Sequence, residues 1–122
     1  MKSFLLVFLG GGLGSGIRYL VTTAMNQYSK VLPFGTFTVN MLGCLLIGLI
    51  LGYAQKENTL TSNQTLLLAT GFCGGFTTFS AFANENLELI KNGEIFNFSV
   101  YTIGSILIGI LAVFIGFYLA NK

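Results

Sequence analysis

Residues 71–82 read "GFCGGFTTFSAF" and interrupt an apolar run that is long enough to cross a membrane. Three glycines, two threonines and a serine stand where a membrane helix ordinarily carries large apolar residues. Adjacent glycines followed by threonines favour local unwinding, and unwound backbone at membrane depth is tolerated only where it is buried in protein or lines a cavity. The stretch therefore predicts a broken membrane helix.

The composition of the rest of the chain agrees with a membrane setting. Of its 122 residues, 53% are hydrophobic and only 8% are charged, whereas soluble domains carry about 25% charged residues. The mean hydropathy is +0.78, and Asp, His and Trp are absent from the sequence. A net charge of +2 is too small to indicate a nucleic-acid partner. We expect membrane lipid to surround most of the chain.

Four apolar runs have the length of about 20 residues that a bilayer core requires. They predict helices over residues 4–23, 34–53, 65–82 and 96–119, separated by "NQYSKVLP", "AQKENTLTSNQ" and "ANENLELIKNGEI". The first run lacks a clear cleavage site, so we expect a retained helix rather than a secretory signal. The sequence predicts an all-α, multi-pass membrane protein with a single domain over residues 1–122, and a plasma membrane as its location.

The basic residues give almost no preference for one orientation in the membrane. Four crossings place Lys2, Lys56 and Lys122 on one side, and Lys30, Lys91 and the nearby Arg18 on the other. Since the bias of Lys and Arg in short loops sets orientation, we expect insertion in both directions and pairing of two copies as an antiparallel homodimer. The alternative is that one partner, or the insertion machinery, fixes a single topology.

Small residues recur at the spacing that lets two helix backbones approach closely. Gly10 and Gly14, and Gly12 and Gly16, form such pairs in the first helix, and the second helix repeats the pattern at residues 48 and 52. The two cysteines, at positions 44 and 73, lack the spacing and the histidines of a zinc site, so we interpret them as small buried apolar residues.

Several polar side chains within the runs need partners. Asn40 lies about 10 Å into the second helix. Its amide requires a hydrogen-bond partner there, either on a neighbouring helix or on a species that passes along the helix. Arg18, about 21 Å along the first helix, either snorkels to the interface or faces an aqueous vestibule. Tyr101 and Ser105 share a face of the last helix. They form either a polar track along the helix or ordinary contacts with a neighbouring helix.

Phe79 and Phe82 follow the break and share a helix face. The edge of an aromatic ring is electropositive, so a pair of edges can line a path for a dehydrated anion. Simple packing of the two rings is the alternative. Carbonyl oxygens freed by the break suit a small hard cation such as sodium.

Together, "GGGLGSGIRY", "PFGTFTVNMLGC" and "GFCGGFTTFSAF" resemble the CrcB, or Fluc, family of fluoride channels, and the resemblance covers the whole chain. It implies a four-helix protein that forms an antiparallel homodimer with two fluoride pores. It also implies passive export of cytoplasmic fluoride, which protects against fluoride toxicity, and a structural sodium ion on the dimer axis. Neither a catalytic motif nor a cofactor motif is visible, so an enzyme is not expected.

The resemblance assigns roles to individual residues. Gly74 and Thr77 would offer backbone carbonyls to sodium, Phe79 and Phe82 would flank the anion, and Arg18 would lie at the vestibule. The fluoride path would further include Asn40, Thr38, Ser80, Tyr101 and Ser105. The chain departs from the family pattern at Ala81, where Thr or Ser is common, and at Gly109, which supplies no hydroxyl to the track.

Two other functions compete with a channel. A small proton-coupled drug exporter needs a carboxylate within the membrane, but the acidic residues Glu57, Glu85, Glu88 and Glu94 are all expected in loops or at helix ends. A non-transporting assembly subunit would explain the glycine pairs, but it gives no reason for the break in the third helix.

Overall fold

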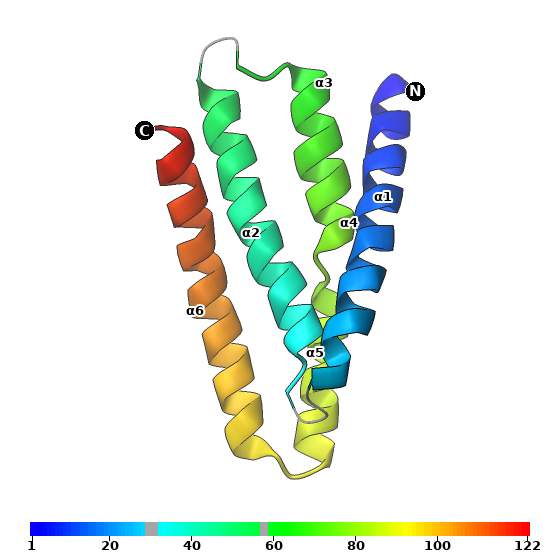
Figure 1. Cartoon of the computed structure of the whole chain (residues 1–122), viewed down its shortest axis with the longest axis vertical. Coiled ribbons are helices and arrows are strands. Elements are labelled where there is room, and N and C mark those ends of the chain that lie inside the picture. The colour runs from blue at the N-terminus through cyan, green and yellow to red at the C-terminus, as the bar shows by residue number, and fades with distance from the viewer. Residues whose placement is uncertain (29–31, 57–58) are drawn as a thin grey trace.

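The computed structural model describes residues 1–28, 32–56 and 59–122, and its regular elements there are all helical (Figure 1). Four helical segments are long and apolar enough to cross a membrane. They are α1 (Lys2–Met25), α2 (Phe34–Gln55), a composite third span (Ser62–Lys91) and α6 (Ile95–Ala120), with a short η1 (Asn26–Tyr28) after α1. The expectation of an all-α chain with four spans and an interrupted third is confirmed.

The third span is built from four helical pieces. They are α3 (Ser62–Thr65), the π-helical η2 (Leu66–Cys73), α4 (Gly74–Phe76) and α5 (Phe79–Lys91). Thr61 starts the span through a capping box, because its hydroxyl accepts from Gln64 N–H while the Gln64 side chain accepts from Thr61 N–H. The π-helical stretch was not predicted from the sequence, since nothing in the apolar pattern separates a π-helix from an α-helix.

The expected end of the third span, near residue 82, is wrong, because α5 continues to Lys91. The segment "ANENLELIKNGEI" looked like a loop because of its polar residues, yet Asn86 and Leu89 lie on the buried side of α5 while Glu88 is exposed. Two residues after Lys91, Gly93 has a φ of +75°, and Glu94 N–H donates to Leu89 O at 2.8 Å. A glycine in the left-handed region is a common helix terminator.

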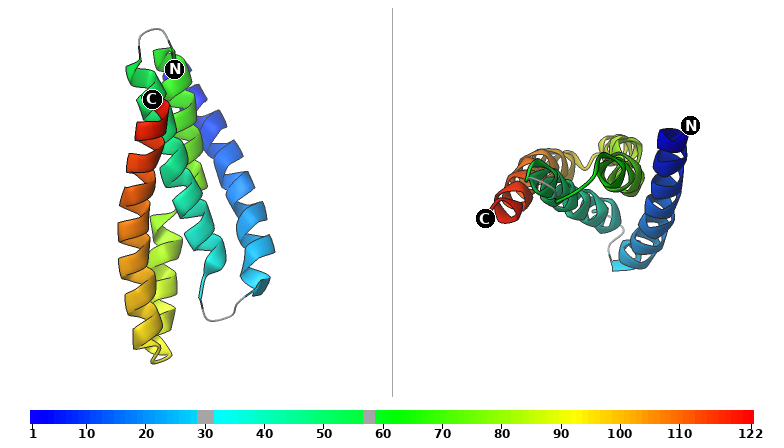
Figure 2. Two further views of the ribbon diagram at one scale, coloured as in Figure 1. Left: turned by 60° about the vertical axis from the view of Figure 1, so that its left-hand side comes forward. Right: turned by 90° about the horizontal axis from the view of Figure 1, so that it is seen from above.

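The four spans lie side by side in an open row (Figures 1 and 2). In that row α6 and α1 occupy opposite ends, with α2 and the third span between them. α2 packs mainly on α6, and α1 packs mainly on η2 and α4. Both termini, the last turn of α2 and the start of α3 lie at one end of the molecule, as four crossings require (Figure 1). Lys30 and Glu57, which entered the charge arguments, are outside the described residues.

Glycines make the closest helix contacts. A methyl group at Gly10 or Gly14 would collide with backbone of residues 67–76, and one at Gly48 would collide with backbone of α6 around Val113. Gly12 and Gly16, by contrast, have no atom within 4 Å of such a methyl group. One of the two expected pairs in α1 therefore packs within the chain, and the other faces outward.

Candidate functional site

The break in the third span lies at Thr77 and Thr78, whose backbones are both extended (φ/ψ of −89°/159° and −150°/116°). Asn40 of α2 holds this segment with both ends of its amide. Its Nδ2 donates to Thr78 O at 3.2 Å, and its Oδ1 accepts from Thr78 N–H at 2.8 Å. The amide that needed a partner at membrane depth thus replaces the helical hydrogen bonds that Thr78 does not make.

Because Thr78 is hydrogen-bonded to Asn40, carbonyl oxygens at the end of α4 are left without their helical hydrogen bonds. In a continuous helix Thr78 N–H would bond Gly74 O, but here it bonds Asn40. Likewise Ala81 N–H, the helical partner of Thr77 O, bonds the Thr78 hydroxyl at 3.1 Å. The carbonyls of Gly74 and Thr77 therefore lose their helical donors.

The neighbouring carbonyls are occupied instead. Cys73 O accepts from both the backbone N–H and the hydroxyl of Thr77. Gly75 O accepts from Ser15 Oγ at 3.3 Å and from Arg18 Nε at 3.0 Å. The half-buried Arg18 thus ties α1 to the break, a contact that neither sequence interpretation of this residue anticipated.

The two phenylalanines after the break have different surroundings. Their ring centroids are 5.7 Å apart with planes inclined by 47°. Phe82 is only 9% exposed and packs on Tyr101, with centroids 5.0 Å apart, whereas Phe79 is 78% exposed. Phe82 is therefore fixed within the chain, and Phe79 projects from it.

A carboxylate joins this cluster. Tyr101 Oη donates to Glu85 Oε1 at 2.8 Å, and Thr36 Oγ1 donates to Glu85 Oε2. Glu85 lies within α5 rather than in a loop or at a helix end, so its expected position was wrong. The polar run had suggested a loop, but one face of α5 is buried. The contact of Thr36 with Glu85 depends on the packing of α2 against α5.

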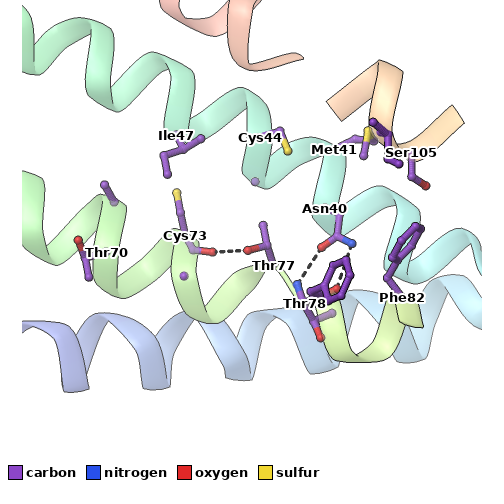
Figure 3. Close-up of a pocket in the computed structure, with 15 residues that line it drawn as sticks. Asn40, Met41, Cys44, Ile47, Thr70, Cys73, Thr77, Thr78, Phe82 and Ser105 are labelled. Atoms are coloured by element: carbon purple, nitrogen blue, oxygen red, sulfur yellow. Dashed lines mark hydrogen bonds between the residues drawn. The ribbon is translucent and has the colours of Figure 1, made fainter. Parts of the chain in front are cut away.

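Most of these groups border one open cavity of about 560 Å³, which we call the central concavity (Figure 3). Its lining combines the broken span, α2 and α6, and it includes Asn40, Thr70, Gly74, Thr77, Thr78, Phe79, Phe82 and Ser105. Ser105 Oγ is buried and has no hydrogen-bond partner among the described residues. A buried hydroxyl without a partner is costly, so this donor is available to something within the concavity.

Other residues expected along the path lie differently. Tyr101 contacts Phe82 but does not itself line the concavity within the described chain, and neither does Thr38, which is half-buried in α2. Ser80 is exposed at the start of α5, with its Oγ 3.2 Å from Thr78 Oγ1. The concavity thus brings together Asn40, both phenylalanines and Ser105.

A metal ion at this site would have to be held by backbone. In the part of the chain that the structure describes, no three His, Cys, Asp or Glu side chains come together as metal ligands. Gly74 and Thr77, whose carbonyls lose their helical donors, line the central concavity, and neutral oxygen atoms are ligands that hard cations accept. The donor set therefore fits an alkali cation better than a transition metal.

Comparison with known proteins identifies the family. Residues 5–117 match the family of CrcB-like, camphor-resistance (CrcB) proteins. The chain belongs to the CrcB family. The resemblance found in the three sequence motifs is confirmed, and it extends over nearly the whole chain.

Curated CrcB relatives cover the chain from end to end. A protein of Flavobacterium psychrophilum is 43% identical over 100% of this chain and 99% of its own length. One of Phocaeicola vulgatus is 47% identical over 99% and 100%, and one of Gloeothece citriformis is 48% identical over 100% and 99%. Each is named a fluoride-specific ion channel FluC. These names confirm that a channel family rather than an enzyme is involved.

Proposed function

We propose that this chain forms a fluoride-selective channel that passively exports cytoplasmic fluoride and so protects a bacterial cell against fluoride toxicity. The channel is an antiparallel homodimer in the plasma membrane. A sodium ion at the dimer interface is structural. Kinship with proteins named fluoride-specific channels supports the transported ion, and the central concavity supports the mechanism.

The observation that carries the proposal is the lining of the concavity at its Phe82 end. There the buried hydroxyl of Ser105 has no partner among the described residues, and the ring of Phe82 is fixed by Tyr101. A hydroxyl donor beside aromatic ring edges stabilises a small dehydrated anion without a buried cation that would trap it. Such weak, neutral contacts suit an ion that must leave as readily as it enters.

The two helix ends at the break support ions of opposite sign. α4 ends at Phe76, and the carbonyls of Gly74 and Thr77 belong to this end, where the helix dipole is negative. α5 begins at Phe79, where the helix dipole is positive. Broken helices in transporters use the same two ends for cations and anions. We assign Gly74 and Thr77 to sodium, and Asn40, Phe79, Phe82 and Ser105 to the fluoride path.

The concavity also supports the homodimer. It is open in one chain, and its lining includes Phe79, Phe82, Gly74 and Thr77. Two carbonyls give a cation fewer oxygens than it prefers, and a two-fold axis doubles that number. Sodium supplies a fixed positive charge that holds the two broken spans together. Arg18 is retained at the vestibule as a proposal, with the added role of bonding Gly75 O.

Glu85 changes the argument against a drug exporter. The sequence predicted that no carboxylate lies within a span, which argued against proton coupling. Because Glu85 does lie within a span, that argument no longer holds. Membership of the CrcB family is now the observation that favours a channel over a proton-coupled exporter. A proton-coupled exporter would also make transport depend on a proton gradient, which a passive channel does not.

The test is ion efflux from liposomes that contain the purified protein. With equal outward gradients of potassium fluoride or potassium chloride, and valinomycin to balance charge, we expect rapid fluoride loss and chloride loss at the rate of protein-free liposomes. Equal loss of both anions, or no fluoride loss from protein shown to be folded, would contradict the proposal.

The phenylalanine that packs on Tyr101 gives a sharper variant. Phe82→Ile removes the ring edge but keeps an apolar side chain of similar depth. We expect fluoride efflux to fall by about tenfold or more, a barrier change of about 1.4 kcal/mol, while size-exclusion chromatography still shows a dimer. Loss of the dimer instead would mean that the ring serves packing.

A further inference from the structure

A second hollow adjoins the central concavity along the third span. It has a volume of about 360 Å³ and is lined by Ala54, Leu60, Ser62, Thr65, Leu66 and Thr70. We call it the entrance hollow, because Ser62 is the first residue of α3, and α3 lies at the same end of the molecule as both termini (Figure 1). Thr70 lines both cavities and is the residue that their linings share.

Thr70 is an unusual hydroxyl for its depth. It lies eight residues after Ser62, within the span, and in the single chain its side chain is exposed with no hydrogen bond to another described residue. A threonine in a membrane helix ordinarily bonds the carbonyl one turn before it, as Thr77 does with Cys73 O at 2.9 Å. Thr70 lies in the π-helical η2 and does not do so.

Oxygen-bearing residues recur along the third span. Ser62 and Thr65 line the entrance hollow, Thr70 lines both cavities, and Gly74 and Thr77 line the central concavity, where Figure 3 labels Thr70 and Thr77. Their successive spacings are three, five, four and three residues, and the five-residue step enters the π-helical η2, so each step is about one helical turn and defines one face. Among the described residues that line the two cavities, none carries a charged side chain. Neutral oxygens bind a hard cation weakly enough to let it move on.

We infer that this face is the route by which sodium reaches the Gly74 and Thr77 carbonyls, with the Thr70 hydroxyl as its midway contact. The inference rests on the proposed sodium site, but it concerns access rather than binding. Replacing the hydroxyl by a methyl group leaves the carbonyls in place while the route loses an oxygen. Exchange of the ion should therefore slow more than its equilibrium affinity falls.

The experiment loads purified full-length protein with radioactive sodium and follows its release into excess unlabelled sodium. We expect Thr70→Val to slow release by about tenfold, with an equilibrium affinity within a factor of about three. Thr70→Ser, which keeps the hydroxyl, should exchange at the wild-type rate. Thr23→Val is the matched control, because Thr23 is exposed on α1 outside both cavities.

The outcomes separate the route from the site. Release from Thr70→Val at the wild-type rate overturns the inference while leaving the sodium site intact. No retained sodium in the wild-type protein overturns both the sodium site and the route. Reduced fluoride efflux of Thr70→Val at saturating sodium, with unchanged exchange, assigns the hydroxyl to the anion and overturns the inference. If Thr70→Val does not fold, slower release from Thr65→Val supports the same route, and an unchanged rate contradicts it.

Discussion

Asn40 is the residue on which the break depends. Its amide pairs with both the N–H and the carbonyl of Thr78, so it stabilises an extended segment inside a membrane span, where unpaired backbone groups are costly. The same contact leaves Gly74 O without its helical donor. One side chain thus both maintains the break and exposes the carbonyl that we assign to sodium.

Replacement of this amide should be costly. Asn40→Leu removes two interhelical hydrogen bonds and leaves the Thr78 backbone unpaired, which we expect to cost about 2 kcal/mol. Thermal unfolding in detergent should occur at a lower temperature, and fluoride efflux should fall. Ser99→Ala is a suitable control, since Ser99 bonds only Ile95 O of its own helix. Equal stability of the two variants would contradict this role of Asn40.

The sequence could predict that Asn40 needs a partner but not which one. The depth of Asn40 in the membrane predicted a hydrogen-bond partner, either on a neighbouring helix or on a passing ion. That the partner is Thr78 depends on how α2 packs on the third span. Thr36 and Glu85 escaped prediction for the same reason, because their hydrogen bond joins residues 49 positions apart. For Ser105, its place on a face of the last helix left a polar track and ordinary helix contacts open, and only the family resemblance placed it on the fluoride path.

Among the elements, α1 carries two glycine faces with different neighbours. Gly10 and Gly14 touch the backbone of the third span, while Gly12 and Gly16 face outward within the chain. The sequence pattern predicts both pairs equally, since spacing alone does not say which face meets a partner. The structure assigns close packing to one pair only.

This difference gives a matched pair of substitutions. Gly14→Ala forces a methyl group against the backbone around Phe72 and should destabilise the protomer by about 1–3 kcal/mol. Gly12→Ala meets no atom within 4 Å, so protomer stability should change by less than about 0.5 kcal/mol. Thermal unfolding of both variants compares them, and a Gly12→Ala protein as unstable as Gly14→Ala would show that the second face is also packed.

The third span shows where reading an element from the sequence fails. The glycines and threonines predicted its break, because those residue types weaken a membrane helix. Its continuation to Lys91 was missed because α5 is amphipathic, with Phe82 and Leu89 buried and polar residues exposed. A count of apolar residues predicts the end of such a helix too early. The recurrence of buried residues every three to four positions predicts its end more accurately.

At the scale of the whole molecule, most large apolar side chains are exposed. Phe79, Phe96 and Phe114 are each more than two thirds exposed, and the buried apolar residues are few. Lipid covers much of this surface in a membrane protein, but Phe79 borders a concavity with polar groups. That combination supports a second copy of the chain over the concavity and lipid elsewhere.

A sodium ion between two copies should stabilise their association. Replacing sodium by a large organic cation such as N-methylglucamine should reduce fluoride efflux and shift the protein towards monomer, because carbonyls paired across the axis lose the charge they surround. Return of sodium should restore both. Unchanged efflux and dimer content, after thorough removal of sodium, would contradict a structural role.

The central claim, a passive and fluoride-selective pore, is tested most directly by the reversal potential of the current across a planar bilayer. With a tenfold fluoride gradient and equal chloride on both sides, the account predicts reversal close to the fluoride equilibrium potential, about 59 mV in magnitude. The value should not move when a pH gradient is added. Reversal near zero, or a shift with the pH gradient, would contradict the account.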